Sequence, residues 1–374
     1  MIPVPSHIVT LKPYIAGKSI DEVERELGII GSIKLASNEN PLGSPPRAIQ
    51  AIADSLGSLA VYPDGGRALR WALADRFVIK PGNVICGSGA ESIIATAMRT
   101  YLDKDDEMIT CEGTFVGFQV LARAWGGKTH FVPLKNYAFD LQGIAARINE
   151  KTKIIYLVNP NNPTGTAVTT NELERFIARV PETVLVILDE AYFEYADGWP
   201  DYPDSMRYRW DNVLTCRTFS KAYGLAGIRI GYAMAHSEII ANLLKVRLPF
   251  EPSTPASAAG LAALEDAGFL EETVRLNRES LLYYHAELER LSVRFTPSLA
   301  NFVMIDFGTP ERVGRIFDGM LRLGVITRPL EAFGLPHCLR ISTGLMEQNH
   351  RAIEALEEVL SAEVPTPPVP PRRG

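Results

Sequence analysis

The sequence has no apolar run long enough to cross a bilayer. Its longest strongly apolar run, from Val184 to Leu188, spans five residues, whereas a membrane-spanning helix needs about 20. The first residues also lack a basic stretch followed by an apolar one, which is the pattern of a secretion signal. We therefore expect neither a membrane partner nor secretion.

Cysteine is scarce. The four cysteines lie far apart and form no C-x-x-C pair; they are Cys86, Cys111, Cys216 and Cys338. Zinc clusters and disulfide frameworks use cysteines at short or regular spacings. We therefore expect no bound metal, no disulfides and a reducing, cytoplasmic location.

Neither sign of charge dominates. Lys plus Arg number 38 and Asp plus Glu 44, for a net charge of -6. A mildly acidic chain has no general attraction for nucleic acid, so we expect no nucleic-acid partner. The apolar fraction of 46% is typical of a globular protein. A length of 374 residues exceeds what one hydrophobic core usually organises, so two domains are expected.

Short apolar runs alternate with helical patterns through the middle of the chain. Strands are expected at residues 83–86, 129–134, 154–158, 184–188 and 213–216. Helices are expected at 90–102 and 140–150, and Thr169 to Glu172 reads as a capping box that opens another. Continuous apolar strands separated by helices predict an α/β fold, with a mostly parallel sheet covered by helices on both faces.

The alternation of apolar strands with helices gives way to a different pattern near residue 270, and this change predicts a smaller α+β domain. Its helices are expected at 270–291, 310–322 and 347–361, and its strands at 301–307, 325–327 and 339–342, joined by an N-terminal strand at 33–36. We therefore predict a large domain over 44–268 and a small domain built from 1–43 and 269–362. The Pro-rich segment 363–374 is expected to be a disordered tail.

Chemically useful residues follow the predicted strands. Ligands of such sheets bind at the carboxyl ends of the strands. The strand at 83–86 is followed by Gly87-Ser88-Gly89, and the strand at 154–158 is followed by Asn159-Pro160-Asn161-Asn162-Pro163-Thr164-Gly165. The strand at 184–188 is followed by Asp189, and Ser220-Lys221 comes soon after the strand at 213–216. Pyridoxal phosphate needs a lysine, an acidic partner for its ring nitrogen, and an anion site such as a helix N-terminus. The sequence offers all three at one sheet edge.

These strings resemble those of fold-type I pyridoxal-phosphate aminotransferases, and most closely the histidinol-phosphate aminotransferases. Further similar strings are Leu35 to Gly43, Tyr62-Pro63, Ser220 to Gly227 and Leu339 to Ser342, so the resemblance covers about Tyr14 to Leu360. It implies a large cofactor-binding domain, a smaller domain and a homodimer. The implied cofactor is pyridoxal phosphate, and the implied partners are an amino donor and a keto-acid acceptor.

The resemblance also implies roles for single residues. Lys221 is expected to hold the cofactor as a Schiff base and to move the proton, and Asp189 to pair with the ring nitrogen. Asn162 and Tyr192 are expected to bond the phenolic oxygen. The residues implied for the cofactor phosphate and the stacking contact are Ala90, Glu91, Thr218, Ser220, Arg229 and Phe115. Glu91 replaces a shorter residue, so we expect its side chain to turn away from the phosphate.

Other implied residues concern the substrate and the dimer. Tyr62 is expected to reach the cofactor phosphate of the neighbouring subunit. The substrate-binding set implied by the resemblance is Tyr14, Asn38, Arg328 and Arg340. Arg340 matches the arginine that binds a carboxylate in aminotransferases, and two arginine forks suit a phosphate. A surface pair between Arg328 and Glu331 is the alternative.

The expected reaction is transamination of histidinol phosphate with 2-oxoglutarate in histidine biosynthesis. Two alternatives share the scaffold: an aromatic-amino-acid aminotransferase and a phosphothreonine decarboxylase. A dinucleotide-binding dehydrogenase is a third alternative, but Ser92 stands where its glycine fingerprint needs a third glycine. A non-catalytic binding protein is the fourth, and Lys221 argues against it.

Overall fold

The computed structural model describes residues 2–11 and 17–363. Two sequence predictions fall on other residues: Tyr14 lies outside the described residues, as does all of the Pro-rich segment except Glu363. Within the described part of the chain, no helix is long and apolar enough to cross a membrane.

The larger sheet is mostly parallel. The described residues place seven strands in it, in the order β2-β8-β7-β6-β5-β3-β4. They are β2 (Val84–Gly87), β3 (Glu107–Cys111), β4 (Lys128–Val132), β5 (Thr152–Val158), β6 (Leu185–Asp189), β7 (Val213–Thr218) and β8 (Gly231–Met234). Strand β8 is antiparallel to both neighbours, whereas the other pairs are parallel. This confirms the predicted fold class.

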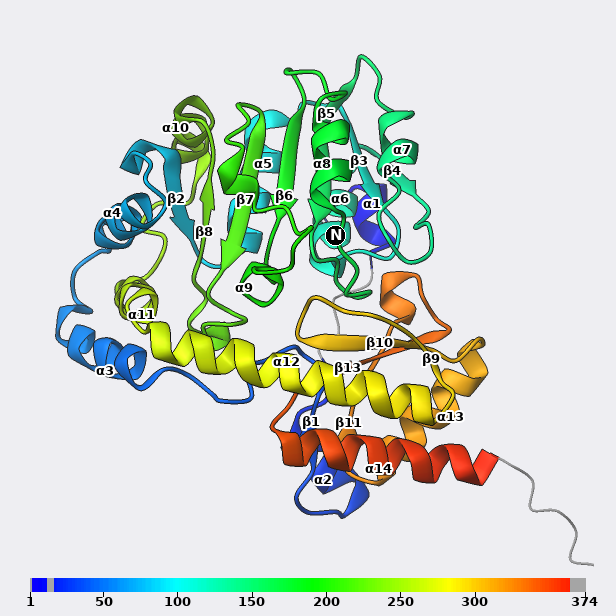
Figure 1. Ribbon diagram of the computed structural model, residues 1–374. Helices are drawn as coiled ribbons and strands as arrows, with labels where there is room; N and C mark the ends of the chain where they lie inside the picture. The colour runs from blue at the N-terminus through cyan, green and yellow to red at the C-terminus, as the bar shows by residue number, and fades with distance from the viewer. Residues whose placement is uncertain (1, 12–16, 364–374) are drawn as a thin grey trace, which may run out of the picture.

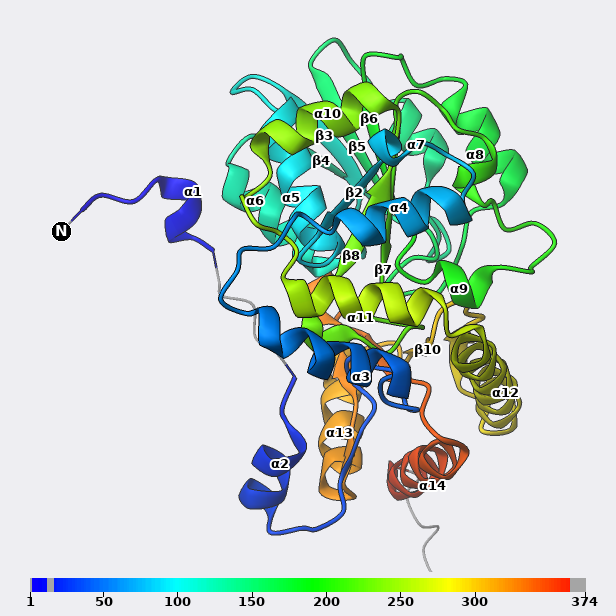
Figure 2. The ribbon, with the colours of Figure 1, turned by 90° about the vertical axis from the view of Figure 1, so that its left-hand side faces the viewer.

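Helices cover both faces of this sheet, as Figures 1 and 2 show. One face carries α5 (Ala90–Tyr101), α6 (Val116–Trp125) and α10 (Ser237–Val246), and the other carries α7 (Leu141–Ala145), α8 (Thr170–Ile177) and α9 (Phe193–Ala196). Every residue of β3, β6 and β7 is buried. A sheet covered on both faces explains why these strands appear in the sequence as continuous apolar runs.

A second, antiparallel sheet lies below the first in Figure 1. Its four strands run in the order β12-β13-β10-β9, and they are β9 (Arg294–Thr296), β10 (Phe302–Asp306), β12 (Arg328–Pro329) and β13 (Cys338–Ser342). The N-terminal strand β1 (Ile33–Lys34) pairs in parallel with β11 (Val325–Ile326). This pairing joins the N-terminal segment to the C-terminal part of the chain.

The remaining helices frame the two sheets. They are α1 (Ser6–Val9), α2 (Ile20–Leu27), α3 (Pro46–Ser55), α4 (Arg67–Arg76), α11 (Thr254–Leu264), α12 (Ala267–Arg290), α13 (Pro310–Arg322) and α14 (Met346–Glu363). The long helix α12 runs from beside the larger sheet to beside the smaller one (Figure 1). It therefore links the two parts of the molecule physically.

Local sequence signals predict one helix start correctly and one helix length wrongly. Thr169 and Glu172 form the expected capping box at the start of α8. The helix expected at 140–150 is wrong in length, because only Leu141–Ala145 is helical. The helix is capped at Ala146. Further on, the Asn149 side chain accepts a hydrogen bond from the Lys151 amide, a local bond that competes with a continued helix.

Candidate active site

A cavity opens where β5, β6 and β7 end and α5 begins. In Figure 1 this edge of the larger sheet faces β10 and β13. The cavity is lined by Ala90, Glu91, Phe115, Val158, Asn162, Asp189, Ala191, Tyr192, Thr218, Ser220, Lys221 and Arg229. Of the residues predicted to touch the cofactor, all but Tyr62 lie in this lining. Segments far apart in the sequence therefore meet at the edge that the strand pattern predicts.

Asp189 is a buried member of the cavity lining, and both oxygens of its carboxylate accept hydrogen bonds. The Tyr156 hydroxyl donates to Oδ2 over 2.7 Å, and the Ala191 amide donates to Oδ1 over 3.2 Å. Burial raises the pKa of Asp189 to about 6, and the two hydrogen bonds oppose that rise because they favour the charged form. The site thus holds a carboxylate out of water with fixed donors.

Lys221 is the nearby amine. Its Nζ donates to the Ser37 carbonyl over 3.3 Å and lies 5.8 Å from the ring centre of Tyr192. Burial, and then the positive charges of Arg340 and Arg229, lower the pKa of Lys221 to about 8. A large fraction of this lysine is therefore neutral, and nucleophilic, at a pH where a surface lysine is fully charged.

The start of α5 forms the anion-binding end of the cavity. The first N–H groups of a helix have no partner within the helix and carry partial positive charge. Gly231 must be a glycine, because a Cβ there would lie 2.4 Å from the Ala90 nitrogen. Arg229 adds a guanidinium that donates to Ser220 Oγ over 3.3 Å, and Thr218 Oγ1 accepts from the Ser220 amide over 3.1 Å. Backbone amides, hydroxyl groups and a guanidinium thus gather at the end of the cavity where α5 begins, and together they can bind an anion.

Asn38 connects the N-terminal segment to the cavity. Its Nδ2 donates to the Tyr192 hydroxyl over 2.9 Å, and its Oδ1 accepts from Ser342 Oγ over 2.8 Å. Asn38 has a φ of 56°, in the left-handed region where asparagine is favoured among non-glycine residues. This residue therefore ties Tyr192, between β6 and α9, to Ser342 at the end of β13.

Two arginines stand opposite each other on the smaller sheet. Arg328 pairs with Arg340 in the antiparallel register of β12 and β13, so their side chains leave the same face of the sheet. Arg340 donates to Asn162 Oδ1 and, over 2.8 Å, to the Ala36 carbonyl. Asn162 lines the cavity, so Arg340 lies beside it, and Arg328 is its neighbour on the adjacent strand.

Two of the predicted cofactor residues need separate description: Tyr62 lies outside the cavity, and the Glu91 side chain extends toward α6. Tyr62 is 75% exposed, stacks on Phe250 at 4.0 Å between ring centres and does not line the cavity of its own chain. Glu91 lines the cavity, and its carboxylate raises the pKa of Asp189. Its Oε1 lies 2.8 Å from where a Cβ on Gly117 would stand, so the side chain extends toward α6.

Tyr156 is a site residue that the sequence analysis missed, because it sits inside an apolar strand. The parallel register of β5 and β6 pairs Tyr156 with Ile187, two residues before Asp189. Alternate residues of a strand share one face. The available signal was a tyrosine within the aliphatic run 154–158, the strand that precedes the one ending in Asp189.

The lining fits pyridoxal phosphate. A buried carboxylate suits its ring nitrogen, a lysine with a lowered pKa suits its aldehyde, and the α5 N-terminus with Arg229 suits its phosphate. The close packing of Gly231 against Ala90 lets the backbone amides at the start of α5 approach the place of the cofactor phosphate.

Comparison with known proteins decides the family. Residues 30–356 match the family described as "Aminotransferase class I and II". The chain is 42% identical to a histidinol-phosphate aminotransferase of Caldicellulosiruptor saccharolyticus over 356 residues, covering 94% of this chain and 99% of the relative. It is also 42% identical to histidinol-phosphate aminotransferase 2 of Pseudomonas fluorescens, over 94% and 95% of the two chains.

The chain belongs to the class I and II aminotransferases. Pyridoxal phosphate is the cofactor of this aminotransferase. The histidinol-phosphate aminotransferase of Sinorhizobium meliloti, solved with pyridoxal-5'-phosphate, is 28% identical to it, with a TM-score of 0.87 over 96% of this chain and 98% of that one. An aspartate aminotransferase of Thermus thermophilus, 23% identical, shares the fold with a TM-score of 0.83 over 96% of this chain and 100% of that one.

Proposed function

We propose that this aminotransferase transfers the amino group of histidinol phosphate to 2-oxoglutarate, as a step of histidine biosynthesis. The observation that carries the proposal is the pairing of Arg328 with Arg340 beside the cavity. Two guanidiniums on one face of a sheet attract an anion, and a phosphate with two negative charges suits the fork geometry of both. The names of the relatives at 42% identity support the same substrate.

Pyridoxal phosphate, when bound, supplies an aldehyde that takes up the amino group and a ring that accepts negative charge from the substrate Cα. Asp189 keeps the ring nitrogen protonated, and Tyr156 keeps Asp189 in place. Lys221, with its lowered pKa, removes the Cα proton and later returns one. Asn162 and Tyr192 bond the phenolic oxygen, and Phe115 covers one face of the ring.

The other members of the lining hold the phosphate of the cofactor. They are the amides of Ala90 and Glu91, the hydroxyls of Thr218 and Ser220, and the guanidinium of Arg229. Asn38 orients Tyr192 through its 2.9 Å hydrogen bond. Arg340 serves both substrates, because it holds the carboxylate of the keto acid and, with Arg328, the phosphate of the amino donor.

A homodimer completes the proposal. Tyr62 and Phe250 stack on each other while 75% and 52% exposed, and the nearby chain also exposes Leu59 and Val61. A patch of this kind on a protein surface marks an association site. A second copy of the chain that covers it brings the Tyr62 hydroxyl to the neighbouring cofactor phosphate.

The decisive experiment compares two amino donors in the Arg328→Ala variant. We expect kcat/KM for histidinol phosphate to fall by about 10²-fold or more, because a charge-assisted phosphate contact is lost. The kcat/KM for phenylalanine, which carries no phosphate, should fall far less. Arg322→Ala, an exposed arginine in the last turn of α13, is the matched control and should leave both values unchanged.

Equal losses with the two donors would remove Arg328 from phosphate recognition. A wild-type enzyme that prefers phenylalanine or tyrosine would support the aromatic-amino-acid alternative instead. Thermal unfolding of each variant shows whether the change acts on the fold.

A further inference from the structure

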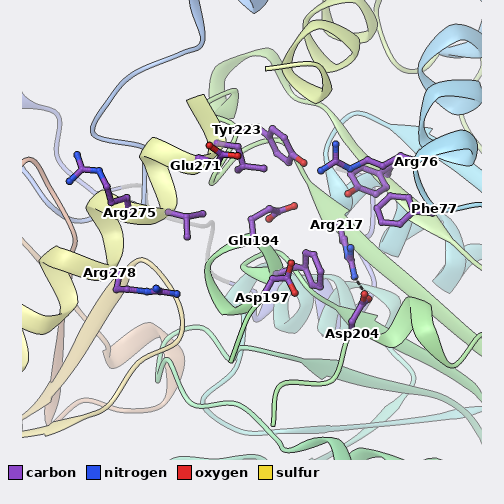
Figure 3. Close-up of a pocket in the computed structure, with 14 residues that line it drawn as sticks. Arg76, Phe77, Glu194, Asp197, Asp204, Arg217, Tyr223, Glu271, Arg275 and Arg278 are labelled. Carbon is purple, nitrogen blue, oxygen red and sulfur yellow. Dashed lines mark hydrogen bonds and ion pairs between the residues drawn. The ribbon is translucent and has the colours of Figure 1, made fainter. Parts of the chain in front are cut away.

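A second cavity lies outside the active site, between α4, α9 and α12 (Figure 3). Its volume is about 550 Å³, within the range of small-molecule pockets. The walls combine aromatic and aliphatic side chains with charged ones. Its lining includes Arg76, Phe77, Phe193, Glu194, Tyr223, Tyr232, Leu270 and Val274.

Glu194 is the unusual member of this lining. The residue is 8% exposed, and its Oε2 has no hydrogen-bond partner among the described residues. Burial raises the pKa of Glu194 to about 7. A buried carboxylate oxygen without a donor is unfavourable, so Oε2 is poised to accept a hydrogen bond from a bound molecule.

Arg76 supplies the opposite charge. In Figure 3 its guanidinium and the Glu194 carboxyl group point toward the same space beside Tyr223, whereas Arg275 points away. Arg76 is close enough to lower the pKa of Glu194, yet no ion pair within the described residues joins the two. A carboxylate and a guanidinium that face one cavity without pairing are complementary to a molecule with both charges.

Two other cations of the lining already have carboxylate partners. Arg217 is fully buried, pairs with Glu190 at 2.7 Å and Asp204 at 2.8 Å, and lies 3.3 Å from the ring centre of Phe193. Arg275 pairs with carboxylates of its own helix α12. Asp197, Glu271 and Arg278 also line the cavity, but all three are exposed. Glu194 is the buried carboxylate, and Arg76, whose Nη1 also donates to the Leu264 carbonyl over 3.3 Å, is the cation that faces it.

We propose that this cavity is a second small-molecule site, which binds an apolar or aromatic α-amino acid with its ammonium group on Glu194 and its carboxylate on Arg76. The side chain of the amino acid packs against Phe77, Leu270 and Val274. This inference goes beyond the proposed transamination and does not rest on it.

Residues of this cavity are next in the chain to residues of the active site. Arg217 directly precedes Thr218, and Phe193 and Glu194 directly follow Tyr192. An amino acid bound here thus contacts the segments that hold the cofactor pocket, and helix α12 between the two sheets forms the other wall.

The test is calorimetric titration of the holoenzyme after borohydride reduction, which blocks Lys221 so that an added amino acid cannot react in the active site. L-Phenylalanine should bind saturably. Phenylpropionic acid lacks the ammonium group and phenethylamine lacks the carboxylate, and both should bind at least about tenfold more weakly, as expected for the loss of one charged hydrogen bond. L-Leucine should bind as well.

Substitutions in the second cavity test whether phenylalanine binds there. Glu194→Gln, which has nearly the same shape, and Arg76→Ala should each weaken phenylalanine binding about tenfold or more. Glu354→Gln and Arg175→Ala, exposed residues on α14 and α8, should leave it unchanged. The basal transamination rate of the Glu194→Gln variant should equal that of the wild type.

Two results would overturn the proposal: no saturable heat at millimolar amino acid, or binding that is the same in the Glu194 and Arg76 variants as in the wild type. The second result would place the amino acid in the active site. If borohydride adds no cofactor to Lys221, the transaminase proposal fails instead, and the same titration on the untreated chain still tests the cavity.

Discussion

The hydroxyl of Tyr156 donates a 2.7 Å hydrogen bond to Oδ2 of Asp189, across two adjacent parallel strands. Both side chains are buried, and the Tyr156 ring stacks on Phe118 at 3.8 Å between ring centres. The stack fixes the ring, so the hydroxyl is presented to the carboxylate in one orientation. Tyr156 is thus a positioning residue for the group proposed to hold the ring nitrogen.

Tyr156→Phe should lower kcat about tenfold, the cost of losing a hydrogen bond to a charged group. The Tyr156 bond lowers the pKa of Asp189, so its loss lets that pKa rise above about 6. The acid limb of the kcat profile should therefore move to higher pH in the variant. A pH–rate profile of both proteins measures this.

Phe118→Leu is the control for packing, because it disturbs the stack and leaves the hydroxyl in place. It should change thermal stability with little displacement of the acid limb. An unchanged limb in Tyr156→Phe would mean that the hydroxyl serves packing alone.

Lys221 should capture pyridoxal phosphate with a rate that rises through about pH 8. Its pKa is lowered to about 8 by burial and then by Arg340, and the neutral amine is the nucleophile. Because the Arg340 charge lowers this pKa, Arg340→Leu should move the rise to higher pH, whereas Arg340→Lys, which keeps a charge, should move it less. Stopped-flow absorbance of the apoenzyme mixed with cofactor gives the midpoint, and a common midpoint in all three proteins would contradict the argument.

Mixed dimers should recover activity if Tyr62 acts across the interface. Tyr62→Ala and Lys221→Ala chains are each expected to be severely impaired. In a heterodimer one of the two sites combines an intact Lys221 with an intact Tyr62, so a random equal mixture should regain about a quarter of the sites. Verified heterodimers without activity would show that Tyr62 does not serve the neighbouring site.

Much of the candidate site is predictable because its residues come directly after buried strands. Asp189 ends β6, and Thr218 ends β7 shortly before Lys221. Parallel strands bring their carboxyl ends to one edge whatever lies between them. The order of the strands in the sheet does not need to be known for that inference.

The same reasoning does not predict strand β8 or the role of Tyr156. Strand β8 has four residues and begins with Gly231, and its antiparallel place between β2 and β7 is fixed by tertiary packing rather than by its own composition. Gly231 is required there by the approach of Ala90, a contact 141 positions distant in the sequence. The domain boundaries proposed at residues 44 and 268 stay predictions.

The most direct measurement of the central claim is a half-reaction. Wild-type holoenzyme is mixed with histidinol phosphate without a keto acid, and the visible absorption of the bound cofactor is followed. We expect one equivalent per chain to be lost, to return on addition of 2-oxoglutarate, and to be absent in Lys221→Ala. No change with histidinol phosphate, or a faster change with phenylalanine or tyrosine, would contradict the assignment.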